Sequence, residues 1–186
     1  MRRTDREMSN AFALEIIDEA QYGVVSLAKD DKPYGIPLSI VRDGDKLFFH
    51  TAKEGHKFDF IRNGAPVSVL FVTRVQVPQL YSNQELDEMM KTEDIADQIV
   101  SQVYTTEFAS AMVKGKLTEV LDDQGKEHAL ELVCKKYTPD KMKYFKLAVE
   151  SGMALTRVFE ISLAEVSAKR KQFDGDKVEM KFGRVE

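Results

Sequence analysis

The stretch that decides the fold is LFFHTAKEGHKFDFIR, residues Leu47–Arg62. It begins with an apolar run that ends in His50-Thr51, and this pattern predicts a strand over residues 46–51. After a short loop that contains Lys53 and Gly55, the pattern predicts a helix over residues 54–63. The sequence therefore predicts a junction at which a strand runs almost directly into the first turn of a helix.

Such a junction is suited to bind an anion. The first turn of a helix has backbone N–H groups without partners, and the helix dipole favours negative charge there. Gly55 lets a ligand approach the backbone, while Lys57 and Thr51 can add a charge and a hydroxyl. A phosphate held there would leave the rest of a nucleotide-like cofactor along the strand ends. The alternative is an ordinary connection with surface lysines, because the chain contains no GxxxxGK[ST] and no GxGxxG motif.

The composition excludes several classes of protein. The 186 residues suffice for one domain, and 27 Lys and Arg against 31 Asp and Glu give a net charge of −4, which argues against nucleic-acid binding. A single cysteine, Cys134, allows no intrachain disulfide and no cysteine metal cluster, and we expect no metal site. No apolar run follows the N-terminal MRRTDREMSN, and none approaches the ~20 residues that span a bilayer. We therefore expect no membrane association and a cytoplasmic location.

The rest of the chain predicts strands that cluster in hairpins. The expected elements are a helix over 10–20, strands over 22–28, 34–42 and 46–51, a buried strand over 67–72, a polar helical segment over about 80–104, strands over 108–121 and 154–163 with two helices between them, and a closing hairpin over 167–182. Pro37 cannot donate a ladder hydrogen bond, so it marks an edge, a bulge or a gap that faces a ligand. Ser82 and Glu85 form a capping box. This order favours an α+β, mainly β fold with an antiparallel barrel.

Several segments together resemble a known family. They are, in order, MRRTDRE, YGVVSLA, YGIPLSI and LFFHTAKEGHKFDFI. This order resembles the FMN-binding split-barrel proteins of the pyridoxamine 5'-phosphate oxidase-like superfamily, and most closely their nitroimidazole-resistance branch. The most specific piece is the string H-[ST]-A-x-x-G-x-K, carried here by His50, Thr51, Ala52, Gly55 and Lys57. The resemblance covers most of the chain except residues 80–103.

The resemblance implies a six-stranded antiparallel split β-barrel with flanking helices. Residues 1–186 would form a single domain with a helical insertion at about 80–104, and two copies would form a homodimer with the flavin at the interface. By the same resemblance, Pro37, Leu38 and Ser39 would run along the flavin ring, His50, Thr51 and Ala52 would follow, and Gly55, His56 and Lys57 would hold the phosphate.

The function that the resemblance implies is a flavin-dependent oxidoreductase that reduces small electrophiles such as nitroaromatic compounds, with a nicotinamide nucleotide or another compound as electron donor. His50 is the candidate catalytic residue, because histidine titrates near neutral pH and can deliver a proton. One alternative is a non-catalytic flavin- or haem-binding sensor, in which His50 could ligate the haem. Another is FAD in place of FMN, with the insertion covering the added adenosine. Oxidation of pyridoxamine phosphate is disfavoured, because the sequence places no second cluster of basic residues.

Overall fold

The computed structural model describes residues 3–92 and 95–182. The strands are β1 (Glu7–Met8), β2 (Gly23–Lys29), β3 (Lys32–Leu38), β4 (Val41–Asp43), β5 (Lys46–Ala52), β6 (Pro66–Gln76), β7 (Glu107–Val120), β8 (Thr156–Ser162) and β9 (Glu165–Lys171). The helices are α1 (Asn10–Glu19), α2 (Asn83–Thr92), α3 (Ala96–Gln98), α4 (Asp123–Tyr137) and α5 (Phe145–Gly152). Short 3-10 turns lie at Thr4–Arg6, His56–Asp59, Pro139–Tyr144 and Met153–Leu155, and a π-helical turn lies at Ile99–Val103.

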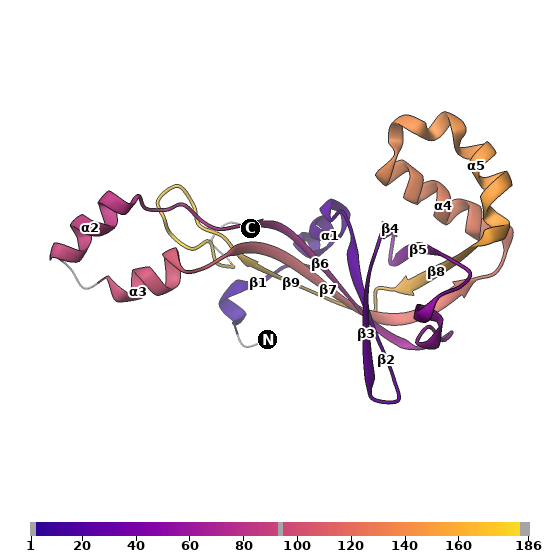
Figure 1. Ribbon diagram of the computed structural model, residues 1–186, viewed down its shortest axis with the longest axis horizontal. Coiled ribbons are helices and arrows are strands. Elements are labelled where there is room, and N and C mark those ends of the chain that lie inside the picture. Colours follow the sequence, from indigo (N-terminus) through magenta and orange to yellow (C-terminus); the bar gives the residue numbers. More distant parts are fainter. Residues whose placement is uncertain (1–2, 93–94, 183–186) are drawn as a thin grey trace.

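The molecule is elongated, with a sheet between two helical parts (Figure 1). At one end, α4 and α5 lie together beside β5 and β8; we call residues 123–155 the helical lobe. At the other end, β6 and β7 extend beyond the body of the sheet and carry α2 and α3. We call this connection, residues 77–106, the arm. Helix α1 packs between these ends, against β6, β7 and β9.

The expected α+β fold with an antiparallel sheet and flanking helices is confirmed. The strands pair in the order β3-β2-β6-β7-β8-β5-β4, with β9 beside β7 and β1 beside β9. The resemblance implies six strands, whereas the described residues form nine strand segments. Two of these segments, β1 and β4, are very short.

The closing hairpin over 167–182 is confirmed at its turn, where Phe173 and Glu179 form an antiparallel bridge. The N–H groups of Asp174 and Met180 there donate to the carbonyls of Val178 and Gln172, but the second half of the hairpin forms no full strand in the described residues. The Glu179 carboxylate also accepts a hydrogen bond from Arg6 at 3.0 Å, which ties this segment to the N-terminal turn.

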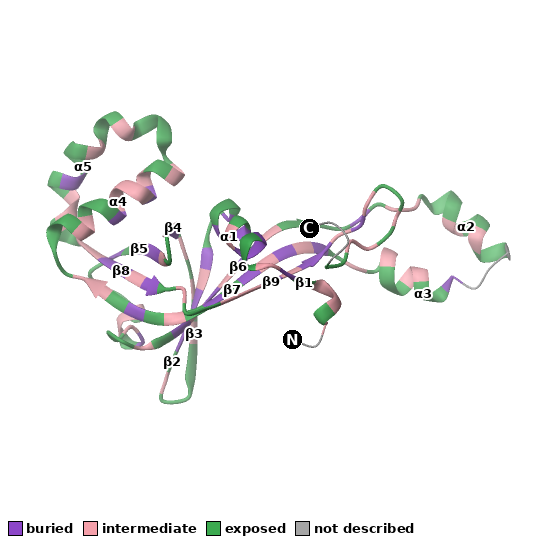
Figure 2. Ribbon diagram, turned by 180° about the vertical axis from the view of Figure 1, so that it is seen from behind, coloured by how far each residue is buried: buried purple, intermediate pink, exposed green. Residues whose placement is uncertain are grey.

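The main core lies between α1 and the sheet (Figure 2). Helix α1 begins as the sequence predicts, because the Ser9 hydroxyl accepts a hydrogen bond from the backbone N–H of Phe12 at 3.1 Å. Its buried face, Phe12, Ala13, Ile16 and Ile17, meets side chains that alternate along the strands, such as Leu47 and Phe49 of β5. This apolar burial is the main stabilising contribution to the fold.

A second, smaller cluster attaches the helical lobe to the sheet. Ala129 and Val133 of α4 pack against Val41, Phe48 and Val158, on the face of β5 opposite to Leu47 and Phe49. Strand β5 is therefore covered on both faces along its first half, which explains its nearly continuous apolar sequence.

Polar contacts at Ile40 complete this attachment. Ile40 lies between β3 and β4, and its N–H donates to the Tyr137 hydroxyl at 2.9 Å, while that hydroxyl donates to the Ile40 carbonyl at 2.9 Å. The Lys136 ammonium donates to the carbonyls of Ile40 and Ile17 at 3.1 and 3.2 Å. Burial lowers the pKa of Lys136 and raises the pKa of Tyr137. The last turn of α4 thus takes the backbone hydrogen bonds that a neighbouring strand would otherwise take.

Strand β7 pairs with β6 along one edge, and along its other edge it changes partner at Gly115. Before this residue, β7 pairs with β9 (Phe108↔Lys171 to Lys114↔Glu165), and after it β7 pairs with β8. A Cβ atom built on Gly115 would lie 2.0 Å from the Ser162 carbonyl oxygen, so only glycine fits where the two pairings meet.

We predict that Gly115→Ala lowers the free energy of unfolding by about 3 kcal/mol or more, because the added methyl group must displace backbone. The measurement is denaturant unfolding followed by circular dichroism. Gly35→Ala is the matched control: its Cβ would meet its nearest neighbour, Val24, at 3.8 Å, an ordinary contact. Equal stability of the two variants would contradict the packing described at Gly115.

Candidate functional site

The segment after β5 is a tight turn. The predicted helix over 54–63 is wrong, because only His56–Asp59 forms one 3-10 turn before the chain extends. Phe60 is buried in the main core, and Phe58 and Ile61 pack against it. Side chains at positions 58, 60 and 61 cannot all face one side of a regular helix, so packing of these three overrides the local helix signal.

The turn still presents hydrogen-bond donors. Gly55 has φ +119°, a conformation open to glycine and strained for other residues, and its carbonyl accepts from the Phe58 N–H at 3.1 Å. In the described part of the chain, the N–H groups of Gly55, His56 and Lys57 have no acceptor. The Lys57 ammonium donates to the Glu54 carbonyl at 2.9 Å and lies beside Gly55. The expected cluster of donors is thus present, but it comes from a turn of four residues and lacks a long helix's dipole.

The last residues of β5 alternate between the core and the opposite face. Thr51 is only 6 % exposed, and its hydroxyl donates to the Ala52 carbonyl at 2.7 Å, so this hydroxyl is already engaged on the core side. His50 and Ala52 are exposed on the other face, which His50 shares with Phe48. Enough of the protein surrounds the His50 ring that desolvation lowers its pKa below the ordinary value.

A shallow hollow lies beside β3. A cavity of about 550 Å³ is lined by Tyr22, Val24, Pro37, Leu38 and Ser39. Pro37 stands opposite Val24 of β2, and in the described residues no strand pairs with the other edge of β3. The hollow therefore combines apolar side chains with free backbone groups of an edge strand.

Strand β3 also reaches the turn after β5. The ring of Tyr34 stacks on Phe60, with ring centroids 4.7 Å apart, and meets the ring of His56 edge-on at 5.5 Å. The His56 Nδ1 atom lies 2.8 Å from a carboxylate oxygen of Asp59. Because residues in a strand rise by about 3.3 Å each, Tyr34 lies roughly 10 Å along β3 from Pro37. The two predicted parts of the site, residues 37–39 and 55–57, thus both adjoin β3. Because Tyr34 and Pro37 are three residues apart, Tyr34 points to the core face of the strand and Pro37 to the opposite face.

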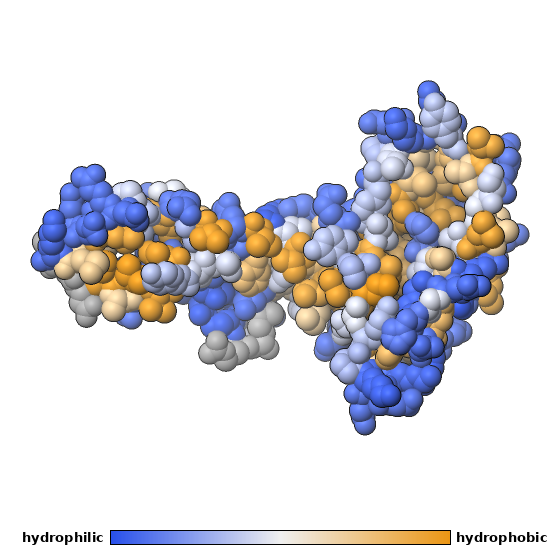
Figure 3. Space-filling model, viewed as in Figure 1, coloured by the Kyte–Doolittle hydropathy of each residue, from blue (hydrophilic) through white to orange (hydrophobic). Residues whose placement is uncertain are grey.

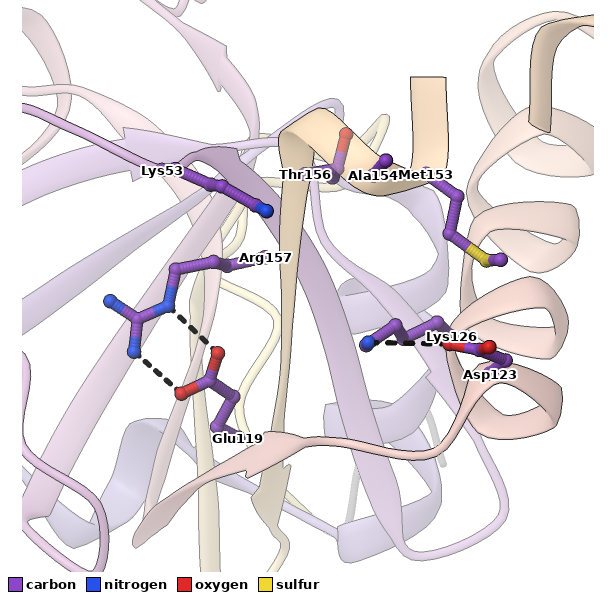
Figure 4. Close-up of a pocket in the computed structure, with 8 residues that line it drawn as sticks. All are labelled: Lys53, Glu119, Asp123, Lys126, Met153, Ala154, Thr156 and Arg157. Carbon is purple, nitrogen blue, oxygen red and sulfur yellow. Dashed lines mark hydrogen bonds and ion pairs between the residues drawn. The ribbon is translucent and has the colours of Figure 1, made fainter. Parts of the chain in front are cut away.

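A second pocket, which no sequence motif indicates, lies between the sheet and the helical lobe (Figure 4). It has a volume of about 440 Å³ and is lined by Lys53, Glu119, Asp123, Lys126, Met153, Ala154, Thr156 and Arg157. The Arg157 guanidinium donates two hydrogen bonds to the Glu119 carboxylate, at 2.7 and 2.5 Å. This pairing raises the pKa of Arg157 and lowers the pKa of Glu119. The only feature of the sequence that indicates this pocket is Arg157, a charged residue inside an otherwise apolar strand.

The comparison with protein families decides the relationship. The family model described as pyridoxamine 5'-phosphate oxidase matches residues 9–85 and 79–170, which include β3, β5 and the turn at Gly55. The chain belongs to the pyridoxamine 5'-phosphate oxidase family. Both parts of the site on β3 lie within the matched residues, as does Arg157. The comparison with curated proteins found no match.

Solved structures share the split-barrel fold with this member of the pyridoxamine 5'-phosphate oxidase family. A candidate 5-nitroimidazole antibiotic resistance protein from Bacteroides thetaiotaomicron matches with a TM-score of 0.64 and 22 % identity, over 88 % of this chain and 86 % of that one. An FAD- and haem-binding protein from Mycobacterium smegmatis matches with a TM-score of 0.68 and 17 % identity, over 95 % and 84 %. An FAD-binding protein from Mesorhizobium loti matches with a TM-score of 0.54 and 18 % identity, over 90 % and 98 %. At these identities the matches establish the fold.

None of the helices in residues 3–92 and 95–182 has the length and hydrophobicity that a bilayer crossing needs. In the same residues, no group of three or more His, Cys, Asp and Glu side chains comes together as it would around a metal ion.

We predict that the lowered pKa of His50 makes stability depend on pH. Folding disfavours the protonated ring, so the unfolded chain binds the extra proton first, and the free energy of unfolding falls as the pH drops below about 6.5. The His50→Gln variant should lose this component of the slope and match the parent's slope above pH 8, where the ring is neutral in both states. The NMR titration of the His50 ring provides the direct check. A midpoint at or above that of an unfolded-chain histidine would contradict the desolvation of the ring by the surrounding protein.

Proposed function

We propose that this chain binds flavin mononucleotide and is a flavin-dependent oxidoreductase for small electrophiles such as nitroaromatic compounds. The observation that carries the proposal is the placement of the hollow at Pro37–Ser39 and the donor turn at Gly55–Lys57 along one edge strand, β3. The first of these suits a flat ring with one polar edge, and the second suits a phosphate.

The residues of the hollow fit the flavin ring. Its apolar wall, Tyr22, Val24 and Pro37, can cover the face of a planar aromatic system. Its rim is the unpaired edge of β3, whose N–H and C=O groups can meet the alternating donors and acceptors of the ring's polar edge. Pro37, which has no N–H, leaves one position on this edge without a donor.

The turn fits the phosphate. The N–H groups of Gly55, His56 and Lys57 begin a helical turn and have no acceptor in the residues that the structure describes. The Lys57 ammonium lies beside them and needs only to leave the Glu54 carbonyl to meet a phosphate oxygen. A contact between an ammonium and a phosphate has charge on both partners and is stronger than the ammonium–carbonyl contact that it replaces.

The relatives support flavin chemistry. Two of the matched structures are described as FAD-binding, one of them also as haem-binding, and a third is described as a candidate nitroimidazole resistance protein. A bound flavin would supply reversible electron transfer. The chain's own part is to hold the flavin and admit a small electron acceptor beside it, with a nicotinamide nucleotide as the electron donor.

His50 is the group that we assign to proton handling. The β4–β5 pairing ends at Val41 and Phe48, which are each two residues from Ser39, at the hollow, and from His50, respectively. Ser39 and His50 are both exposed. Because its pKa is lowered, His50 is mainly neutral near pH 7, and it acts by taking up a proton before delivering it at Nδ1 or Nε2.

A second copy of the chain would complete the site. We call the face of the sheet opposite to the main core its outer face. On it, Pro37 pairs with Val24, Val24 with Leu70, and Leu70 with Met112, which makes an apolar row across four strands. Met112 and the nearby Val72 are exposed. Apolar residues also gather over the middle of the molecule in Figure 3. Because the row continues into the hollow, we propose a homodimer that packs along it and closes the flavin site.

The visible absorption spectrum of protein purified without added cofactor tests the proposal, followed by mass analysis of what heat releases. Flavin bands with released mononucleotide, and oxidation of a nicotinamide nucleotide with a nitroaromatic acceptor, are the expected results. A Soret band would favour the haem-binding alternative, for which the exposed His50 is the candidate ligand. Released dinucleotide would replace FMN by FAD. A colourless protein that takes up no added flavin would refute the proposal.

We predict that Lys57→Ala weakens flavin binding by about 1–3 kcal/mol, because the phosphate loses a charge-assisted contact. The measurement is the dissociation constant from flavin fluorescence quenching. Lys135→Ala, on the exposed face of α4 where Lys135 pairs with Glu131, removes the same charge away from the site and should leave binding unchanged. If the two variants bind flavin equally well, Lys57 has no phosphate role.

A further inference from the structure

Contacts with the segment around Lys171 and Lys177 hold the described residues of the arm. The Lys177 ammonium pairs with Glu85 at 3.2 Å and lies 4.1 Å above the Tyr81 ring, and the Lys177 carbonyl accepts a hydrogen bond from Gln102 at 3.1 Å. The Lys171 ammonium donates to the Ser101 carbonyl at 3.2 Å. The segment that follows β9 thus holds both halves of the arm.

The exposed surface of the arm is apolar and acidic. Tyr104 is 81 % exposed and Val100 70 %, and Met90 and Val77 are also exposed. The charged residues among them are Glu85, Asp87, Glu88 and Asp97, with Lys91 as the one base among the described residues of the two arm helices. Large apolar side chains on a projection, rimmed by mainly acidic residues, are typical of a surface that binds another protein.

The opposite end of the molecule carries a complementary surface. Residues 141–147 of the helical lobe expose Lys141, Lys143 and Lys146 together with Tyr144 and Leu147, and we call these five residues the lysine patch. Leu147 is 68 % exposed. The nearby acids are Asp140 and Glu150. Patch and arm thus share apolar side chains and differ in the sign of their charge.

We propose that the arm of one copy docks on the lysine patch of a second copy of this chain. This rests on the homodimer proposed above, in which the outer faces of the two sheets meet. Arm and lobe lie at opposite ends of the molecule, so the arm does not reach the lobe of its own chain (Figure 1). A two-fold axis across the sheet brings each arm to the partner's lobe, and symmetry makes the contact twice.

Charge selects this arrangement over the other two-fold arrangement. Turning the second copy the other way would set arm against arm and lobe against lobe, which brings like charges together at both ends. The arrangement that we propose pairs acidic with basic surfaces at both ends and covers exposed apolar side chains on each. The arm therefore fixes the orientation of the two chains in the dimer.

Zero-length carbodiimide cross-linking tests the contact directly. Ordinary and ¹⁵N-labelled chains are mixed, exchanged, cross-linked and digested, and the products are identified by mass spectrometry. We expect peptides of mixed isotope that join Asp87 or Glu88 to Lys141, Lys143 or Lys146. A dimer that yields only arm-to-arm links, or none between arm and lysine patch, would overturn the proposal.

Charge reversal gives an independent measurement. Asp87→Lys with Glu88→Lys on the arm, or Lys143→Glu with Lys146→Glu on the lobe, should each weaken dimerisation at least tenfold at low salt, measured by analytical ultracentrifugation. The four changes together should restore it. Lys29→Glu with Lys32→Glu, at the β2–β3 hairpin, is the matched control and should have no effect. Without restoration by the fourfold variant, the docking is refuted.

The flavin content of each variant separates this proposal from the proposed function. Flavin bound to a parent protein that is monomeric would overturn the docking and leave flavin binding intact. A dimer that shows the arm-to-patch links but takes up no flavin would support the docking and refute the function.

Discussion

The fold depends on the close approach of β7 to the chain at Ser162. Strand β7 pairs with β9 before Gly115 and with β8 after it, so a single strand belongs to both halves of the barrel. The absence of a side chain at Gly115 allows the Ser162 carbonyl to lie against the backbone there. This contact sets the angle between the two halves. The orientation of β5, which runs beside β8 and leads into the turn at Gly55, follows from it.

The candidate site lies where this arrangement leaves backbone groups unpaired. Strand β3 is an edge strand in the described residues, and the turn at Gly55 comes directly after β5. Tyr34 joins the two through its ring contacts with Phe60 and His56. Edge strands and the first N–H groups of a turn would need partners if they were buried, so a site for a polar ligand uses groups that the fold leaves available.

Much of the fold can be predicted from local signals in the sequence. The Ser9 cap of α1, the capping box of Ser82 and Glu85, and the hairpin at Gly44 depend on residues a few positions apart, and the structure has all three. The prediction over 54–63 was wrong because burial of Phe60 against the distant strands outweighs the local helix signal. The site residues at the end of β5 were predicted from one short stretch, and those on β3 from the family resemblance. The Arg157–Glu119 pair joins two strands distant in sequence, and a charged residue in an apolar strand does not identify its partner.

The contact of Tyr137 with Ile40 has a mechanical consequence. One hydroxyl group bonds both the N–H and the C=O of a single residue, next to Ser39 at the edge of the hollow. Helix α4 and this segment therefore move as one body: a displacement of the helix either carries Ile40 with it or breaks two hydrogen bonds at once. A displacement of the helical lobe is therefore transmitted through Ile40 to its neighbour Ser39, which lines the hollow.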